Sequence, residues 1–245
     1  SPSKEGADLK LLAFESSAKA AGTALLSDGC LLAEYMQNSG QTHSRTLMEL
    51  AKNMLSGCDL TPQDIDAVAV AAGPGSFTGV RIGMACAKGF AWGRQLPLYG
   101  VSTLEAMVRG AACADGGYCA CMDARKWQIY NALFNWTDGA LLRRTEDRAI
   151  AISELSQELK NIPGPVYLAG DGAKLVFDTL KEENLPLRLL PEHLRPQRAS
   201  GVALTAMEKI AAGEPADAAA LTPNYLRQAQ AERTRQHDKD FYLKK

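Results

Sequence analysis

The sequence predicts an α/β protein in which two similar units each contain a mixed sheet flanked by helices. Strand-like and helix-like patterns alternate along most of the 245 residues. The order strand, acidic residue, tight turn, strand and Asp-Gly occurs twice, about 110 residues apart, which is typical of a duplicated unit. The length is sufficient for two compact domains. We therefore expect two related domains with a cleft between them.

The first unit is expected to begin with a meander of three short apolar strands. A helical period follows, and then a buried strand, a glycine-rich loop and a second helix. We expect strands at residues 9–14, 21–26, 30–36, 65–72 and 96–101, and helices at about 42–55, 78–93 and 102–112.

The second unit repeats this order, with strands expected at 118–122, 127–136, 166–169 and 187–190 and helices at about 153–160, 173–181 and 200–212. We place the N-terminal domain at 1–108, with the segment from about 200 packing back on it, and the C-terminal domain at 109–199. The tail at 228–245 is expected to be frayed. Ser44, Ser153 and Ser200 are expected to begin and cap their helices.

Composition excludes some functional classes. The chain has 27 basic and 28 acidic residues, so no global field attracts it to nucleic acid or to anionic lipid. No apolar run is long and uncharged enough to cross a bilayer. Six cysteines without a Cys-x-x-Cys pair indicate small buried hydrophobes in a reducing compartment. We expect a soluble cytoplasmic protein.

The central stretch, Gly73–Gly93, combines a glycine loop with a helix. Gly79, Gly83 and Ala87 recur every fourth residue, so they share one helix face that another backbone can approach closely. This face either receives a partner or seats the helix against its own sheet. The loop is compatible with phosphate binding at a helix start, but it lacks the Gly-Lys-Ser/Thr of a Walker loop.

Three turns are expected to border the cleft. They carry Glu15, Ser16 and Ser17 in the first unit, Asp123 and Arg125 in the second, and Gly170 and Asp171 in a later glycine loop. The layout is similar to that of actin-like ATPases, whose paired turns hold phosphates. In that fold the first turn carries aspartate followed by glycine and threonine, and the second carries a glycine where this chain has Arg125. We therefore interpret these turns as degenerate cleft positions.

Longer motifs carry a family resemblance. They are Ala72–Gly83, His43-Ser44, Gly100–Leu104, Met122–Arg125 and Pro223–Arg227. Together they resemble the bacterial TsaB family, formerly called YeaZ, over the chain up to about Arg227. The resemblance implies two duplicated domains of the actin-like ATPase (ASKHA, RNase H-like) fold. It also implies a subunit of the machinery that makes threonylcarbamoyladenosine beside the anticodon of tRNA.

The resemblance further implies a non-catalytic scaffold that holds and activates TsaD. Other implied partners are TsaE and, indirectly, a TsaC-type enzyme and tRNA, with a homodimer when the protein is isolated and no membrane. It implies no required cofactor and leaves weak binding of an adenine nucleotide open. The implied pairing surface is the glycine loop and its helix: Gly73, Pro74, Gly75, Ser76, Phe77, Thr78, Gly79, Val80, Arg81, Gly83, Met84, Ala87 and Phe90.

The histidines agree with a non-catalytic role. TsaD binds its metal through a His-x-x-x-His pair, whereas this chain has only His43, His193 and His237, none at that spacing. We therefore expect no metal site. An ATP-dependent small-molecule kinase or ATPase that uses the cleft is the alternative, and a peptidase is a third hypothesis. Basic residues of the tail are a further candidate contact to tRNA phosphates.

Overall fold

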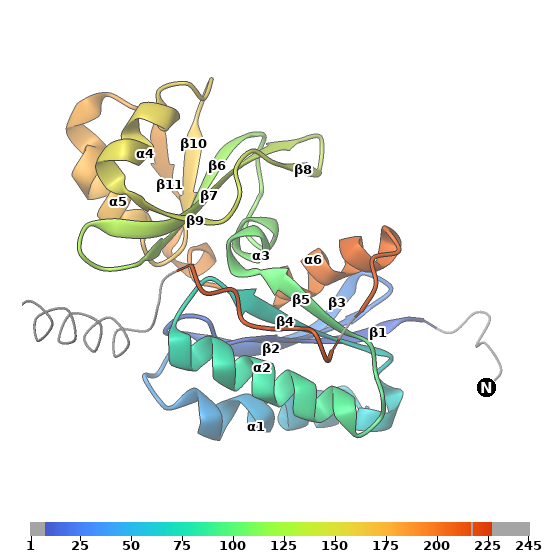
Figure 1. The fold of residues 1–245 in the computed structure, drawn as a ribbon. Coiled ribbons are helices and arrows are strands. Elements are labelled where there is room, and N and C mark those ends of the chain that lie inside the picture. Colours follow the sequence, from blue (N-terminus) through green and yellow to red (C-terminus); the bar gives the residue numbers. More distant parts are fainter. Residues whose placement is uncertain (1–7, 217, 227–245) are drawn as a thin grey trace, which may run out of the picture.

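The computed structural model describes residues 8–216 and 218–226 (Figure 1). The first sheet has the order β3-β2-β1-β4-β5. Neighbouring strands β1, β2 and β3 are antiparallel, whereas β4 runs parallel to both β1 and β5. The strands are β1 (Lys10–Glu15), β2 (Ala21–Ser27), β3 (Cys30–Gln37), β4 (Ala67–Gly73) and β5 (Leu98–Ser102).

The second sheet repeats this arrangement. Its order is β11-β10-β6-β7-β8, with an antiparallel meander followed by two parallel pairs. The extra strand β9 pairs with β7. The strands are β6 (Gly116–Asp123), β7 (Gln128–Thr137), β8 (Ala140–Arg143), β9 (Arg148–Ala151), β10 (Val166–Ala169) and β11 (Leu187–Leu189). The expected duplication is therefore confirmed in strand order and direction.

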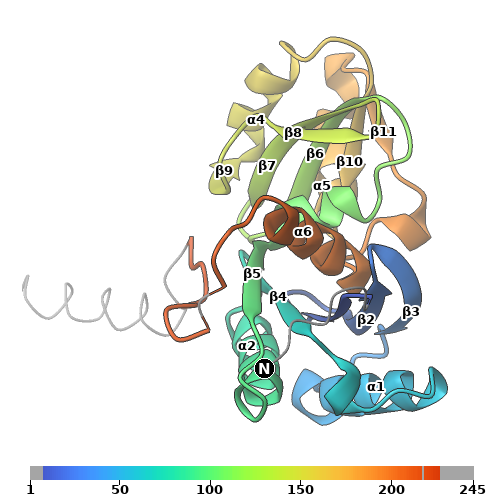
Figure 2. The same ribbon diagram turned by 90° about the vertical axis from the view of Figure 1, so that its right-hand side faces the viewer.

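Helices cover both sheets (Figure 1, Figure 2). Helices α1 and α2 pack on the outer face of the first sheet and α4 and α5 on that of the second, while α3 and α6 lie between the sheets. The helices are α1 (His43–Gly57), α2 (Phe77–Trp92), α3 (Thr103–Arg109), α4 (Ile152–Leu159), α5 (Ala173–Leu180) and α6 (Ala199–Ala211). Short 3-10 turns occur at Pro62–Asp64, Lys181–Glu183 and Glu192–Leu194.

Helices α3 and α6 join the two units. Helix α6 packs on the first sheet, and α3 contributes apolar side chains to the core of the second. The two helices approach closely, since a Cβ at Gly201 would overlap the carbonyl oxygen of Ala106. The expected boundary between residues 108 and 109 thus falls inside α3.

The structure corrects the expected helix caps. Thr42, Ala151 and Arg198 occupy the N-cap positions in place of Ser44, Ser153 and Ser200. Helix α6 is instead capped from a distance, because the carboxylate of Glu34 on β3 accepts from the N–H and hydroxyl of Ser200 (2.9 and 2.8 Å) and pairs with Arg198. A helix start fixed by a residue so far away in the sequence leaves no local signal.

Strands β8 and β9 were not predicted, because each has only four residues and little periodicity. All six cysteines are free; Cys119 and Cys121 are buried as expected, whereas Cys30 and Cys113 are exposed, which corrects the expectation of buried cysteines at these two positions. Within the described residues, no helix is long and apolar enough to cross a membrane. The predicted frayed tail and His237 lie outside the described residues.

Candidate functional site

The first cleft turn follows β1 and is folded inward. Glu15 is 1% exposed, and its Oε1 accepts a hydrogen bond from the N–H of Ser17 at 2.5 Å. Its Oε2 and the Ser17 hydroxyl have no hydrogen-bond partner among the described residues. Burial disfavours the charged carboxylate, so the pKa of Glu15 is raised to about 7. The acid faces the interior of the protein and does not line the cleft.

The start of α2 closes over this turn. The Ser76 N–H donates to the Ser17 carbonyl at 2.6 Å, and the Ser16 hydroxyl donates to the Gly79 carbonyl at 2.9 Å. A Cβ at Gly79 or Gly83 would overlap the carbonyl or the hydroxyl oxygen of Ser16. The glycines of α2 are therefore needed because the chain's own first turn lies against them.

This packing corrects the interpretation of the small-residue face. Gly79, Gly83 and Ala87, which the resemblance placed in the pairing surface, are buried inside the first unit, so the alternative of packing within the chain is the one observed. Val80 and Met84 are also buried, and the Phe90 ring packs on Phe14 with centroids 6.3 Å apart. Helical spacing correctly placed the small residues on one face, but that face is already occupied.

The opposite face of α2 is open. Its exposed residues recur at helical spacing: Thr78, Arg81, Ala85, Gly89 and Trp92. Trp92 is 83% exposed, and the neighbouring helix α1 presents Met48 at 40% exposure. A Cβ at Gly89 would contact nothing within 4 Å. Of the predicted pairing residues, only Ser76, Thr78 and Arg81 are exposed; Phe77 is half-buried.

A C-terminal segment, residues 221–226, crosses the start of α2. Tyr225 stacks on Phe77 with centroids 4.8 Å apart, and its hydroxyl accepts from the Nε of Arg81 at 2.6 Å. The Arg81 guanidinium also lies 3.8 Å from the centre of the Phe77 ring. The Asn224 N–H donates to the Ala72 carbonyl at 2.7 Å. This packing was missed because nothing local in the sequence marks it.

The second cleft turn repeats the first in backbone geometry. Asp123 accepts from the N–H of Arg125 at 2.7 Å, as Glu15 does from Ser17. Gly73 precedes α2 and Gly170 precedes α5, and both glycines have positive φ angles, +112° and +101°. A side chain at Gly170 would overlap the Cys121 carbonyl. The second turn differs in that Asp123 and Arg125 are exposed.

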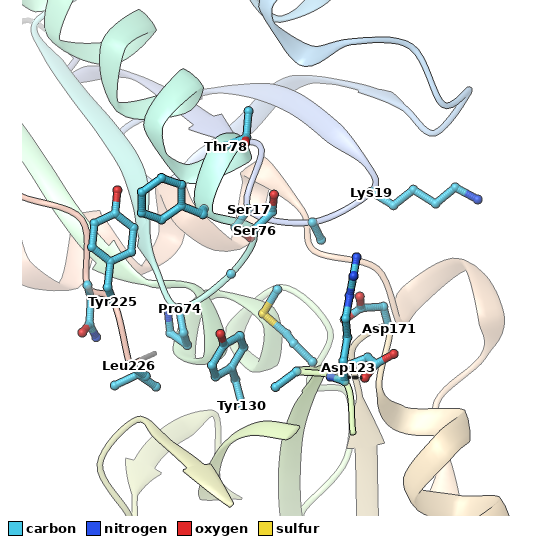
Figure 3. Close-up of a pocket in the computed structure, with 17 residues that line it drawn as sticks. Ser17, Lys19, Pro74, Ser76, Thr78, Asp123, Tyr130, Asp171, Tyr225 and Leu226 are labelled. Atoms are coloured by element: carbon cyan, nitrogen blue, oxygen red, sulfur yellow. Dashed lines mark hydrogen bonds between the residues drawn. The ribbon is translucent and has the colours of Figure 1, made fainter. Parts of the chain in front are cut away.

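A cavity of about 530 Å³ separates the two turns. Figure 3 shows Asp123 and Asp171 on one side, Tyr225 and Leu226 on the other, and Pro74 and Tyr130 between them. The Asp171 carboxylate accepts from Gln197 at 3.2 Å. The remaining lining residues include Ser17, Lys19, Gly75, Ser76, Phe77, Thr78, Met122, Ala124, Arg125 and Asn224.

Two carboxylates line the cavity, those of Asp123 and Asp171, whereas Glu15 is turned inward. Residues 8–216 and 218–226 contain no group of three or more histidine, cysteine, aspartate or glutamate side chains placed to hold a metal ion. The N–H groups of Ser17 and Arg125 donate to the carboxylates of Glu15 and Asp123. The His43 ring is hydrogen-bonded through its Nε2 to the Ala18 carbonyl at 2.8 Å.

Comparisons with known proteins assign the chain to a family. A family model described as "TsaD: tRNA N6-adenosine threonylcarbamoyltransferase" matches residues 32–234. The Bacillus subtilis "tRNA threonylcarbamoyladenosine biosynthesis protein TsaB" is 33% identical over 228 residues, which cover 91% of this chain and 96% of that protein. The chain belongs to the TsaB family. The Escherichia coli protein of the same name is 32% identical over 74% of this chain and 79% of its own length.

Solved structures agree with the TsaB assignment. YeaZ from Pseudomonas aeruginosa aligns with a TM-score of 0.75 and 26% identity over 89% of this chain and all of that one. Component A of the Acidaminococcus fermentans (R)-2-hydroxyglutaryl-CoA dehydratase aligns with a TM-score of 0.50 at 12% identity, over 83% of this chain and 99% of that one. This likeness concerns the fold alone, and the fold is that of the actin-like ATPases, as expected.

Proposed function

We propose that this chain is a non-catalytic subunit for the synthesis of threonylcarbamoyladenosine in tRNA, and that it acts by holding TsaD in an active form. The observation that carries the proposal is the 33% identity, over nearly the whole chain, to a relative named for this biosynthesis. The burial of Glu15, which holds this acid away from the cavity, supports a role without chemistry of its own. We expect the protein to act in the cytoplasm, with TsaE, a TsaC-type enzyme and tRNA as further members of the system and no cofactor of its own.

The outer face of α2 is the surface that we propose for TsaD and, in the isolated protein, for a second copy. This outer face, Thr78, Arg81, Ala85, Gly89 and Trp92, combines small residues that permit close helix approach with an exposed indole and a guanidinium. Aromatic side chains and arginine are enriched at the centres of protein interfaces. The stack of Arg81, Phe77 and Tyr225 fixes one end of this surface.

Binding of purified TsaD, followed by light scattering and titration calorimetry, tests this surface. Ala85→Glu places a charge in the middle of the outer face without touching the core. We expect it to abolish TsaD binding and to lower tRNA modification in the reconstituted system. The matched control is Leu142→Glu, which also places an acid at an exposed apolar position, but on β8 of the other unit. Equal binding by Ala85→Glu and the wild type would reject the surface.

The kinase or ATPase alternative is tested with the pure chain. It predicts ATP hydrolysis or phosphoryl transfer that Asp123→Ala abolishes, whereas the scaffold proposal predicts neither activity. The scaffold proposal also predicts that threonylcarbamoyl transfer requires TsaD in the mixture. Turnover of ATP by the chain alone, abolished in Asp123→Ala, would replace our proposal with this alternative.

A further inference from the structure

The turn between β6 and β7 has an unusual backbone. Arg125, Lys126 and Trp127 have φ angles of +64°, +55° and +59°, so three consecutive residues with side chains adopt the left-handed conformation. This conformation is disfavoured for L-residues other than glycine and, to a lesser degree, asparagine and aspartate. Sparsely populated conformations of this kind cluster at functional sites. A turn of ordinary structural purpose would place glycine or asparagine here.

The side chains of this turn are displayed to solvent. All three residues are exposed, and Trp127 is 69% exposed. The ion pairs and ring contacts of the described chain include none to Arg125, Lys126 or Trp127. A large exposed indole beside two cations without an ion pair in the described chain therefore contributes nothing visible to the stability of the fold.

The backbone of the turn, in contrast, is fixed. The Ala124 N–H donates to the Gln128 carbonyl at 3.0 Å, and the Gln128 N–H donates to the Arg125 carbonyl at 3.2 Å. The Trp127 carbonyl accepts from the Ile152 N–H at 3.3 Å. Side chains that project from a fixed backbone lose less conformational freedom when they bind. The turn is thus pre-organised for a ligand outside the protein.

We propose that Arg125, Lys126 and Trp127 bind an unpaired nucleotide of RNA, with its base stacked on the Trp127 indole and its phosphates next to the two cations. Unpaired bases in RNA loops are commonly recognised by stacking on aromatic side chains, and every base offers a flat face. Lysine and arginine supply the sequence-independent contact to phosphate. Asp123 is the one acid of this turn, and its Oδ1 is occupied by the Arg125 N–H.

This inference rests on the proposed function, because tRNA is the RNA that such a subunit would meet. It gives the chain a direct contact with RNA despite a net charge of -1. The site lies on the second unit, whereas the proposed TsaD surface is on α2 of the first. The two surfaces border the same cavity, because Arg125 and Thr78 both line it.

Anisotropy of a labelled RNA hairpin with an unpaired loop tests the proposal on the full chain, alone and with TsaD. We expect Trp127→Ala to weaken hairpin binding about tenfold, and Trp127→Phe to retain most of it. Leu142→Ala, which removes an exposed apolar side chain on β8 of the same unit, should bind the hairpin as the wild type does. Replacing Arg125 and Lys126 by Gln should lower the slope of log affinity against log salt by about 0.7 for each phosphate that is no longer neutralised.

Four results would overturn the proposal. The wild type could fail to bind the hairpin both alone and with TsaD, or it could bind a fully paired duplex equally well. ATP could displace the hairpin completely while binding with the same affinity as the hairpin, or Trp127→Ala could leave hairpin binding unchanged. The two proposals fail separately. If the wild-type chain binds the RNA hairpin but does not bind TsaD, the scaffold function alone is rejected. Normal TsaD binding and tRNA modification with an RNA affinity independent of Trp127 would reject this inference alone.

Discussion

Two glycines on one helix should respond in opposite ways to the same substitution. A methyl group at Gly83 would overlap the Ser16 hydroxyl, whereas a methyl group at Gly89 would contact nothing. Both positions lie within α2, so both gain about 1 kcal/mol of helix propensity from alanine. Gly89→Ala should therefore stabilise the protein by up to about 1 kcal/mol.

At Gly83 the gain in helix propensity is smaller than the cost of overpacking against Ser16. Overpacking in a closed interior costs about 1–3 kcal/mol, and the displaced Ser16 hydroxyl loses its bond to Gly79, a further cost of about 1 kcal/mol. The net expectation is a loss of about 1–3 kcal/mol, and Gly79→Ala should be worse because a backbone carbonyl is the obstacle.

Urea unfolding at two protein concentrations measures both variants and separates folding from self-association. The expected difference in unfolding free energy between Gly83→Ala and Gly89→Ala is about 2–4 kcal/mol, the sum of their opposite effects. A Gly83→Ala protein as stable as the wild type would refute the conclusion that the small-residue face is filled by the chain itself. A bulky residue at Gly83 would overlap Ser16 and so affects folding. Binding of TsaD therefore has to be tested with substitutions on the outer face of α2.

Substitutions at three further positions test other interactions. The pKa of Glu15 in the folded chain, about 7, exceeds its ordinary value of 4.5, so the folded chain holds a proton that the unfolded chain releases. The free energy of unfolding should therefore fall by about 3 kcal/mol as the pH rises from about 4.5 to 7. In urea titrations at several pH values, Glu15→Gln should remove this dependence on pH. Glu34→Ala leaves Arg198 and the Ser200 N–H without their partner and should cost about 2–4 kcal/mol in urea unfolding, more than Glu34→Gln, which can still accept from Ser200. Tyr225→Ala should lower the melting temperature by about 2–4 °C through loss of its ring stack, whereas an equal loss in Tyr225→Phe would assign the effect to the hydroxyl.

The order of elements was predictable because its signals are local. The β-branched strand at 65–72, the glycine loop and the helix after it are each marked within a few residues, and β4 and α2 lie where they were expected. The occupant of a helix face is not marked in this way. Spacing shows that Gly79 and Gly83 share a face, but only tertiary structure shows that Ser16 fills it.

Other parts of the site depend on interactions between distant residues. Arg81 and Tyr225 are 144 positions apart, and Glu34 caps a helix that begins 165 residues later. Periodicity within a window of a dozen residues contains no information about such pairs. The burial of Glu15 is of the same kind, since a polar turn after a strand is expected to be exposed and becomes buried only when α2 closes over it.

The duplicated turns explain how the two units came to offer different surfaces. Each turn has the same acid-to-N–H bond, at Glu15 and at Asp123. In the first unit a helix of 16 residues packs on the turn, and glycines on the inner face of α2 make this close approach possible. In the second unit the corresponding helix, α5, has 8 residues, and the turn remains exposed with Trp127 at its end. A long helix with a free outer face suits contact with protein, and an open turn with an indole and two cations suits RNA. If this division holds, Ala85→Glu should impair TsaD binding alone and Trp127→Ala RNA binding alone; one variant that impairs both equally would show that the two surfaces act as one.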